Sequence, residues 1–301
     1  MEIVTGLILK RLFRRKAAVA GLIFILITLA AGIWAPYVAP NDPYEVNVTL
    51  KLLKPSLEYP LGTDQLGRCI LSRLIYGART SLATGLMVTA FILLIGVPLG
   101  LISGYAGGIT DNIIMRLVDV ATTLPSTMLA LALVGIYGPS LRLLTLVFIC
   151  LWWAPFARLV RSQVLKIKEF EFVTAAEASG CSQTAIILKH IAPNIMSPII
   201  VYATLRVAAV ITHVAGFSFI GLGSQPPIAD WGVMLSDSRQ YLTSQPLMLL
   251  WPGLAIMLSV LAFNLFGEGL DEAMRLTSED LAVVKEEESR VDGPHFIGAK
   301  P

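Results

Sequence analysis

Few side chains in this sequence could do chemistry, and two of them lie inside a long apolar stretch. Arg206 and His213 interrupt the otherwise uncharged residues 195–222. They are seven residues apart, about two turns of an α-helix, so both would lie on one helix face. An ionisable group in apolar surroundings is costly, which makes this pair a candidate for binding or conducting a ligand. The competing explanation is structural: Arg206 would pair with Asp119, or Asp119 with Arg116 one turn before it.

The sequence lacks the motifs of metal sites and of hydrolases. Cys69, Cys150 and Cys181 are far apart and have no metal-ligand spacing. A lone histidine such as His213 is a poor metal site because stable coordination needs several ligands, so we expect neither a metal nor a cofactor on this chain. No His-Glu-x-x-His occurs, and residues 216–221 miss the Gly-x-Ser-x-Gly spacing by one residue. The sequence therefore does not favour an enzyme, and nothing in it points to nucleic acid.

The composition explains the surroundings of these residues. Of the 301 residues, 55% are hydrophobic and 15% are charged, and the mean hydropathy is +0.72. A chain of this kind needs lipid as its solvent. Backbone N–H and C=O groups must be paired within the chain there, and the apolar runs are long, so we predict an all-α membrane protein.

The order of the segments predicts six transmembrane helices. Residues 1–16 form a basic amphipathic helix on the cytoplasmic surface, residues 17–35 a first span, and residues 36–80 an extracytoplasmic segment. A cleaved signal peptide is the alternative for the first span, although its apolar region would be shorter. Residues 81–268 form the transmembrane core. Its spans are expected near 81–105, 112–137, 142–162, 195–222 and 247–267.

Charge predicts the orientation of these spans. Lys10, Arg11 and their basic neighbours precede the first span, which places the N-terminus in the cytoplasm by the positive-inside rule. Six spans return the C-terminus to the same side. Residues 269–301 would then be a cytoplasmic tail, solvated and largely disordered from about Thr277 because acidic residues dominate it.

Glycine and proline positions indicate how the spans pack. Gly96, Gly100 and Gly104 recur every fourth residue, so they share a helix face on which a neighbouring backbone can approach closely. A glycine hinge is the alternative. Pro125 and the glycines that follow residue 215 are expected to kink or break their helices.

One cytoplasmic loop, near 163–194, is more patterned than a connector needs to be. Residues 170–181 read Phe-Glu-Phe-Val-Thr-Ala-Ala-Glu-Ala-Ser-Gly-Cys. The alanines favour a helix, and Gly180 permits the left-handed turn that ends it. We expect a second short helix after Gly180 and its end at Pro193, before the chain re-enters lipid. Such a helix–turn–helix could fit a groove of another protein and move as a lever, although an ordinary loop helix remains the alternative.

This loop resembles the coupling loop of ABC importer permeases, in which Glu-Ala-Ala, three further residues and Gly precede a hydrophobic stretch and a Pro. Thr174 stands where the family usually has the first Glu. The resemblance implies the type I ABC importer permease fold. It also assigns contact with an ATPase to a set of loop residues: Thr174, Ala175, Ala176, Glu177, Gly180, His190 and Pro193.

Further segments resemble the dipeptide, oligopeptide and nickel branch of these permeases. They are residues 61–68, 71–82, 230–237, 251–255 and 262–265. Within the branch, residues 212–223 and 236–246 look closer to nickel permeases, so the expected cargo is nickel or a nickel complex. A dipeptide, an oligopeptide or a metal–metallophore complex is the alternative. A membrane-embedded hydrolase is a remote one.

The resemblance also implies partners and a location. The chain would lie in a prokaryotic cell (inner) membrane beside a second homologous permease. Two ATP-binding subunits would hydrolyse ATP, because this chain has no Gly-x-x-x-x-Gly-Lys-Ser/Thr loop. An extracytoplasmic substrate-binding protein would deliver the cargo. Arg206 and His213 would then be candidate pathway residues in a transporter that works by alternating access.

Overall fold

The structure of the chain, a computed structural model, describes residues 2–291 and the side chains of residues 6–275. Helices and irregular connections make up this part of the chain, which contains no β-strand. The helices are α1 Glu2–Arg14, α2 Lys16–Ile33, α3 Ala35–Val38, η1 Val48–Leu50, α4 Ile70–Ala106, α5 Gly108–Thr123, α6 Ser126–Tyr137, α7 Leu141–Lys168, α8 Glu171–Ala178, α9 Gln183–Ala185, η2 Ile186–Ile191, α10 Ala192–Phe219, α11 Trp231–Ser238, η3 Arg239–Tyr241 and α12 Pro246–Val291.

Within the described residues, five helices are long and apolar enough to cross a membrane, and there are up to six spans if α5 and α6 together make one. The axes of α5 and α6 differ by 70° at a break between Thr123 and Ser126. Pro125 is the N-cap of α6, where its missing N–H costs little. The fold class is therefore the predicted all-α membrane protein, and the kink expected at Pro125 is confirmed.

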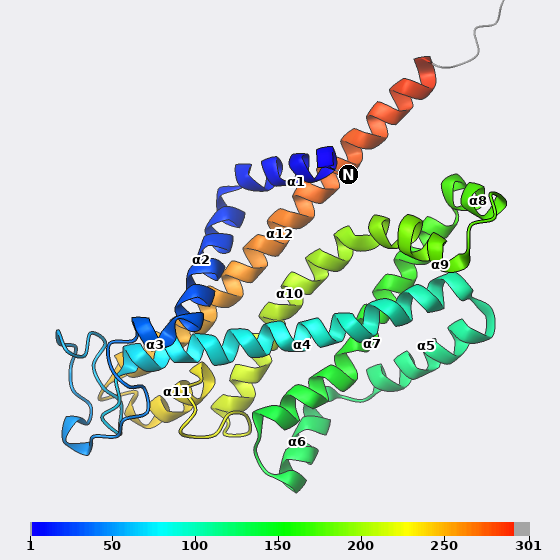
Figure 1. Ribbon diagram of the computed structural model, residues 1–301. Coiled ribbons are helices and arrows are strands. Elements are labelled where there is room, and N and C mark those ends of the chain that lie inside the picture. Colours follow the sequence, from blue (N-terminus) through cyan, green and yellow to red (C-terminus); the bar gives the residue numbers. More distant parts are fainter. Residues whose placement is uncertain (1, 292–301) are drawn as a thin grey trace, which may run out of the picture.

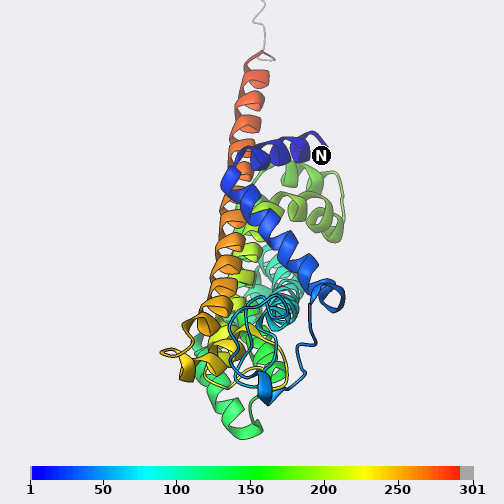
Figure 2. The same cartoon turned by 90° about the vertical axis from the view of Figure 1, so that its left-hand side faces the viewer.

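The spans run between two ends of the molecule. Helix α1, helix α8 and the far part of α12 lie at one end, which we call the α8 end (Figure 1). The long connection between α3 and α4 lies at the opposite end together with α11, and we call this the α11 end. The view from the side shows the same division (Figure 2).

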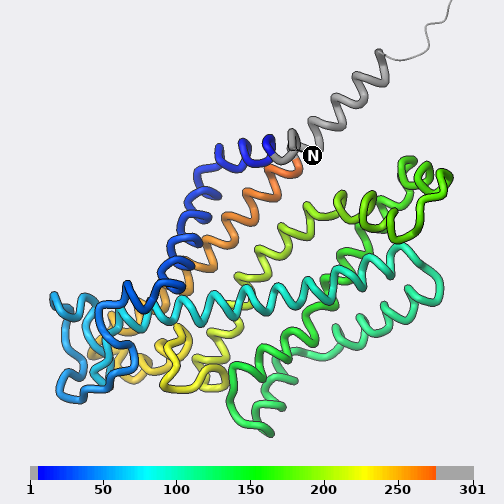
Figure 3. Tube along the Cα trace, in the orientation of Figure 1, coloured from blue at the N-terminus to red at the C-terminus, as the bar shows by residue number. Residues whose placement is uncertain are grey.

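Helices α4 and α7 form the centre of the packing. The trace of the chain in Figure 3 shows α4 crossing the molecule beside α7 before it turns into α5. A Cβ added at Gly100 would lie 2.6 Å from the carbonyl oxygen of Ala157 and from Cβ of Val160. The nearest α7 atoms would lie at 2.8 Å from a Cβ at Gly96 and at 2.6 Å from one at Gly104. These three glycines therefore form the predicted packing seam.

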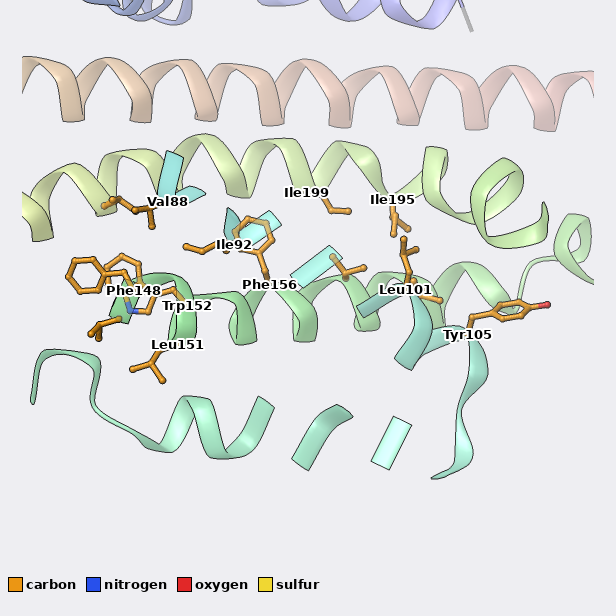
Figure 4. Close-up of a cluster of buried hydrophobic side chains, with 14 of the residues drawn as sticks. Val88, Ile92, Leu101, Tyr105, Phe148, Leu151, Trp152, Phe156, Ile195 and Ile199 are labelled. Atoms are coloured by element: carbon orange, nitrogen blue, oxygen red, sulfur yellow. The ribbon is translucent and has the colours of Figure 1, made fainter. Parts of the chain in front are cut away.

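Side chains from three helices fill the core beside this seam. Figure 4 shows Val88 and Ile92 of α4 and Phe148 and Phe156 of α7 among them, with Ile199 of α10 facing the same interior. Phe148 and Trp152 of α7 stack at 4.4 Å between ring centroids. The core thus fixes α10 against α7, which matters for the polar residues that α10 carries.

Helix α4 begins earlier than expected. It starts at Ile70, inside the segment 36–80 that was expected to precede the second span. Two charged residues of this segment are buried: Arg68 is 3% exposed and Arg73 is 1% exposed. Both lie near Asp64, with Nε of Arg68 at 2.6 Å and Nε of Arg73 at 3.5 Å from Oδ2. Mutual neutralisation lets this polar stretch fold as part of the helical body.

The end of the chain also differs from its prediction. Helix α12 continues to Val291, so the stretch from Thr277 to that residue is helical rather than disordered. Its Ala, Leu, Glu and Lys residues are good helix formers, and it continues a helix whose hydrogen-bond ladder is already formed. Packing of Leu12 and Ala18 against Leu270 and Ala273 holds α12 against the N-terminal helices. The remainder of the predicted tail, 292–301, lies outside the described residues.

Candidate functional site

The turn after α8 has the geometry that the sequence predicted. Gly180 has φ +75°, in the left-handed region that favours glycine. Its N–H donates to the carbonyl of Glu177 at 3.0 Å, and the N–H of Cys181 donates to the carbonyl of Ala176 at 3.1 Å. These two bonds form a Schellman motif, which ends the helix and satisfies its last carbonyls. Two short helices therefore meet at Gly180, as expected.

Pro193 does not end the second of these helices. Ser182 caps it by accepting a hydrogen bond from the N–H of Ala185 at 3.3 Å, and the chain continues through η2, a π-helix, directly into α10. The expected break is wrong because the wider turn of η2 just before Pro193 relieves the clash between a proline ring and the preceding turn. The segment after Gly180 is thus a rigid extension of α10.

The residues of α8 divide between core and surface. Val173 is 1% exposed and Ala176 is 8% exposed, and both pack in the core that contains Ile186 and Ile191. The other coupling residues predicted on α8, Thr174, Ala175 and Glu177, are exposed, as are Gly180 and Pro193. His190 is half-buried in η2, and its carbonyl accepts a hydrogen bond from Nδ2 of Asn194 at 2.6 Å.

An exposed aromatic pair was missed by the sequence prediction. Phe170 is 55% exposed and Phe172 is 42% exposed, and their rings stack with centroids 6.0 Å apart. Two phenylalanines flanking an acidic residue in a loop between spans were the available signal. The two rings form an exposed apolar surface at the start of α8.

Polar contacts connect α8 to the end of α4. The hydroxyl of Tyr105 donates to Oε1 of Glu177 at 3.1 Å. Nζ of Lys168 donates to the carbonyl of Tyr105 at 2.7 Å and lies 5.0 Å from the centre of its ring. Tyr105 therefore connects α8 and the end of α7 to the end of α4.

A second link fixes the turn between α4 and α5. Arg161 of α7 holds both carboxylate oxygens of Asp111, with Nε at 2.6 Å from Oδ1 and Nη2 at 2.5 Å from Oδ2. Ser103 of α4 also donates to Oδ1 of Asp111. A bidentate arginine–carboxylate pair is directional as well as strong, so α4, α5 and α7 are held in register at the α8 end.

The two candidate pathway residues share the face of α10 that meets α7. Cζ of Arg206 lies 5.4 Å from the centre of the Trp152 ring and 5.1 Å from that of Tyr202, and its Nη2 donates to the Tyr202 hydroxyl at 2.6 Å. The ring of His213 lies edge-on to Trp152 at 4.9 Å. The two residues therefore share one helix face, as their spacing predicted, and the structure brings both to the same tryptophan, which the sequence did not indicate.

Neither pairing predicted for Asp119 occurs. Oδ1 of Asp119 lies 2.9 Å from Nη2 of Arg158, and both side chains are more than half exposed. Helix α5 packs against α7 rather than α10, which takes Asp119 away from Arg206. Arg158 on the facing helix reaches Asp119 with good geometry, which accounts for its preference over Arg116 on the same helix.

The two aromatic rings offset the cost of Arg206 by an amount of the same order as that cost. An arginine at the centre of a membrane helix costs about 2.5–3.5 kcal/mol on insertion scales. Each cation–π contact contributes about 0.5–2 kcal/mol, with the larger value for a desolvated ring. Trp152 is 8% exposed, so its face is largely dry. The rings orient the guanidinium and stabilise it without neutralising its charge.

The α11 end carries buried ionic groups of its own. Arg68 lies between Asp64 and Asp237, with Nη2 3.2 Å from Oδ2 of Asp237, and so ties the connection before α4 to α11. Asp230 caps α11 by accepting hydrogen bonds from the N–H groups of Gly232 and Val233. Burial raises the pKa of the Asp230 carboxyl, against the opposing effect of these hydrogen bonds. These contacts cap α11 and tie it to the connection before α4, and α11 also packs against α10 and α12.

Metal ligands do not gather in the described part of the chain, where no three His, Cys, Asp or Glu side chains are placed to hold an ion. The described part of the chain is a helical membrane body with up to six spans and a short helical turn at the α8 end, and the comparisons assign it to a class of membrane transport subunits. Over residues 96–275 the chain matches the family described as "Binding-protein-dependent transport system inner membrane component", and it belongs to that family. Residues 5–55 match the N-terminal TM domain of oligopeptide transport permease C.

Individual relatives agree with this assignment. The dipeptide transport system permease protein DppC of Alkalihalophilus pseudofirmus is 44% identical over 266 residues, 88% of this chain and 87% of that protein. The nickel transport system permease protein NikC of Escherichia coli is 39% identical over 256 residues, 85% of this chain and 91% of that protein. The chain is an ABC importer permease subunit, a translocation component without catalytic activity.

The solved structures show the same fold. A chain of the MetNI methionine ABC transporter in an inward-facing conformation aligns with a TM-score of 0.55 at 17% sequence identity. The alignment covers 69% of this chain and 97% of that chain. At this identity the likeness concerns the arrangement of helices and says nothing of cargo.

Proposed function

We propose that this chain forms half of a translocation pathway, the other half being a second related permease, and that two separate ATP-binding subunits drive it. An extracytoplasmic binding protein delivers the cargo. The observation that carries this proposal is the lever at the α8 end. Helix α8 presents an exposed aromatic pair outward while Val173 and Ala176 anchor it in the core.

The lever explains how hydrolysis elsewhere moves the spans. ATP-driven closure of the ATP-binding subunits pushes on Phe170 and Phe172, and the push passes through Glu177 and Tyr105 to α4. The helix after Gly180 continues without interruption into α10, so the same push tilts α10. Tilting of α4 and α10 together opens the pathway alternately to the two sides of the membrane.

Co-purification tests this assignment of the lever. A tagged chain should retain the second permease and both ATP-binding subunits. A double variant, Phe170→Ala with Phe172→Ala, should lose the ATP-binding subunits and keep the second permease. Phe91→Ala is the matched control, since Phe91 is 45% exposed on α4 away from α8. Retention of the ATP-binding subunits by the double variant would disprove the proposed contact.

The α8 end faces the cytoplasm in this proposal, and both chain termini lie on that side. Five basic residues, Lys10, Arg11, Arg14, Arg15 and Lys16, lie at this end and support the orientation. Cysteine-accessibility labelling of intact cells should modify a probe at Glu58 and spare one at Glu287. The reverse labelling pattern would overturn the orientation.

The cargo we propose is a short peptide. The 44% identity to a dipeptide permease supports this, and so does a fixed positive charge in the middle of α10, which suits an anionic group better than a bare cation. Nickel, favoured by residues 212–223 and 236–246, is the second candidate because a nickel permease is 39% identical.

Parallel uptake assays separate the two cargoes. A deletion strain complemented with this chain and its partner subunits would be given radiolabelled dialanine or radiolabelled nickel. Uptake of dialanine without nickel accumulation is expected. Nickel accumulation without dialanine uptake would replace the peptide by the second candidate and leave the permease assignment intact.

A further inference from the structure

We infer that Arg206 forms a carboxylate-binding site in the middle of the membrane, through which the cargo passes. This inference rests on the proposed function, since it assigns a recognition step to the same pathway. Helix α10 runs from Ala192 to Phe219, so Arg206 lies about halfway along it. A ligand that contacts Arg206 is therefore far from water at either end of the helix.

The guanidinium is oriented before any ligand arrives. It lies over the rings of Trp152 and Tyr202, and the Tyr202 hydroxyl accepts one of its N–H groups at 2.6 Å. A guanidinium carries five N–H donors in a fixed plane. The donors not used by Tyr202 have no acceptor among the described residues, so this side chain is held in place with hydrogen-bonding capacity to spare.

Several acids near the spans are already engaged elsewhere, and Glu268 and Asp271 of α12 are exposed. Asp119 pairs with Arg158 and Asp111 with Arg161, while Glu177 accepts from Tyr105. At the α11 end, Asp64 and Asp237 hold Arg68. Among the described side chains no carboxylate lies within ion-pair distance of Arg206. Within the described part of the chain Arg206 thus has no acidic partner, and a carboxylate on a ligand can supply one.

The same face of α10 is open toward the α11 end. Thr212, His213, Gly216, Phe217 and Ile220 line a hollow of about 260 Å³ there. His213, which lines it, contacts the ring of Trp152, and Arg206 contacts that same ring. Only the ring of Trp152 thus lies between His213, which lines the hollow, and the guanidinium of Arg206.

The chemistry selects a carboxylate. A planar guanidinium binds a carboxylate through two parallel N–H···O bonds and repels a bare metal cation. A short peptide brings such a group at its C-terminus, and a nickel chelate of a carboxylic acid brings it in its ligand. A transport site must also release its cargo, so its affinity must be low. A single guanidinium–carboxylate contact is compatible with such weak binding.

Transport by the complete importer in proteoliposomes tests the inference. This chain, the second permease, the ATP-binding subunits and saturating loaded binding protein would be given ATP and radiolabelled dialanine. Arg206→Gln should lower the uptake rate roughly tenfold to a hundredfold, the effect of losing one charge-assisted hydrogen-bonded contact. ATP hydrolysis and subunit stoichiometry should stay at the wild-type values. Arg206→Lys keeps the charge and should lose less.

A control variant and a binding measurement complete the test. Arg116→Gln removes an exposed arginine of α5 and should transport as wild type. Tryptophan fluorescence of the purified importer without binding protein should respond to dialanine and not to dialanine amide, and Arg206→Gln should abolish the difference. Equal responses to acid and amide in the wild type would overturn the inference. So would loss of the second permease from the Arg206→Gln complex, because Arg206 would then pair with that subunit.

The two proposals fail separately. If the wild type imports nickel citrate and no dialanine, the peptide cargo is wrong. The carboxylate site then stands if the fluorescence response to citrate disappears in Arg206→Gln, and it falls if the response persists. If the wild type imports dialanine and Arg206→Gln does so at the same rate, the cargo stands and the site falls.

Discussion

Tyr105 and Glu177 are 72 positions apart in the sequence, and their side chains share a hydrogen bond of 3.1 Å between the end of α4 and helix α8. The hydroxyl is the donor and Oε1 the acceptor. Lys168 at the end of α7 holds the carbonyl of Tyr105 and covers its ring. Three helices therefore meet at one tyrosine beside the lever, and its hydroxyl is the part that reaches the lever itself.

Tyr105→Phe should weaken coupling without disrupting assembly. The ring and its contact with Lys168 remain, and only one hydrogen bond is removed, about 0.5–1.5 kcal/mol. We expect cargo moved per ATP hydrolysed to fall about two- to tenfold in proteoliposomes, while the complex purifies intact. Tyr137→Phe at the exposed end of α6 is the control and should not change this ratio. An unchanged ratio in Tyr105→Phe would show that coupling does not depend on the hydrogen bond between Tyr105 and Glu177.

Gly180→Val should uncouple transport while the protein stays in the membrane. A β-branched residue resists φ +75° and would misalign α8 with the helix that continues into α10. No atom lies within 4 Å of a Cβ added at this position, so the effect comes from the backbone and not from crowding. Uptake and membrane content are measured together.

Gly180→Asn is the matched control for that substitution. Asparagine tolerates the left-handed region far better than valine, so it should retain most of the transport rate. Normal transport by Gly180→Val would show that the turn is only a connection. Equal loss in both variants would show that bulk on the surface, and not backbone conformation, is what matters.

Gly100→Val should destabilise the helical body. The added side chain would meet the backbone and Val160 of α7 at 2.6 Å, and overpacking of this kind costs about 1–3 kcal/mol. The midpoint of thermal unfolding in detergent should fall. Gly135→Val, on α6 with nothing within 4 Å of the added Cβ, is the control and should leave the midpoint near the wild-type value. Equal midpoints for the two variants would refute the seam.

His213→Ala should slow uptake modestly and leave the choice of cargo unchanged. The imidazole lines the hollow on α10 and contacts Trp152, but binding at high affinity belongs to the binding protein, since a gate must release what it passes. Uptake of dialanine and nickel is measured in the variant and in a strain without the binding protein. Total loss of uptake in His213→Ala, or a switch of cargo, would assign the residue a larger role.

The sequence by itself determined the class of protein and its main elements. Long apolar runs require helices in lipid, because every backbone polar group must be paired within the chain there. Positive φ at Gly180, the seam at Gly100 and the shared face of Arg206 and His213 also followed from sequence, since each depends on local spacing or on the backbone freedom of glycine. These features could be predicted because each depends on residues that are close together in the sequence.

Tertiary structure decided which charged groups meet. Asp119 pairs with Arg158 on the facing helix because α5 packs on α7, and Arg206 lies over Trp152 because α10 also packs on α7. Tyr202, the other ring at Arg206, is one turn earlier on α10 itself. Burial of Arg73 in the first turn of α4 likewise depended on the folding back of Asp64, in the connection just before that helix. The partner of a charged side chain depends on which helices pack together. It therefore cannot be predicted from local spacing.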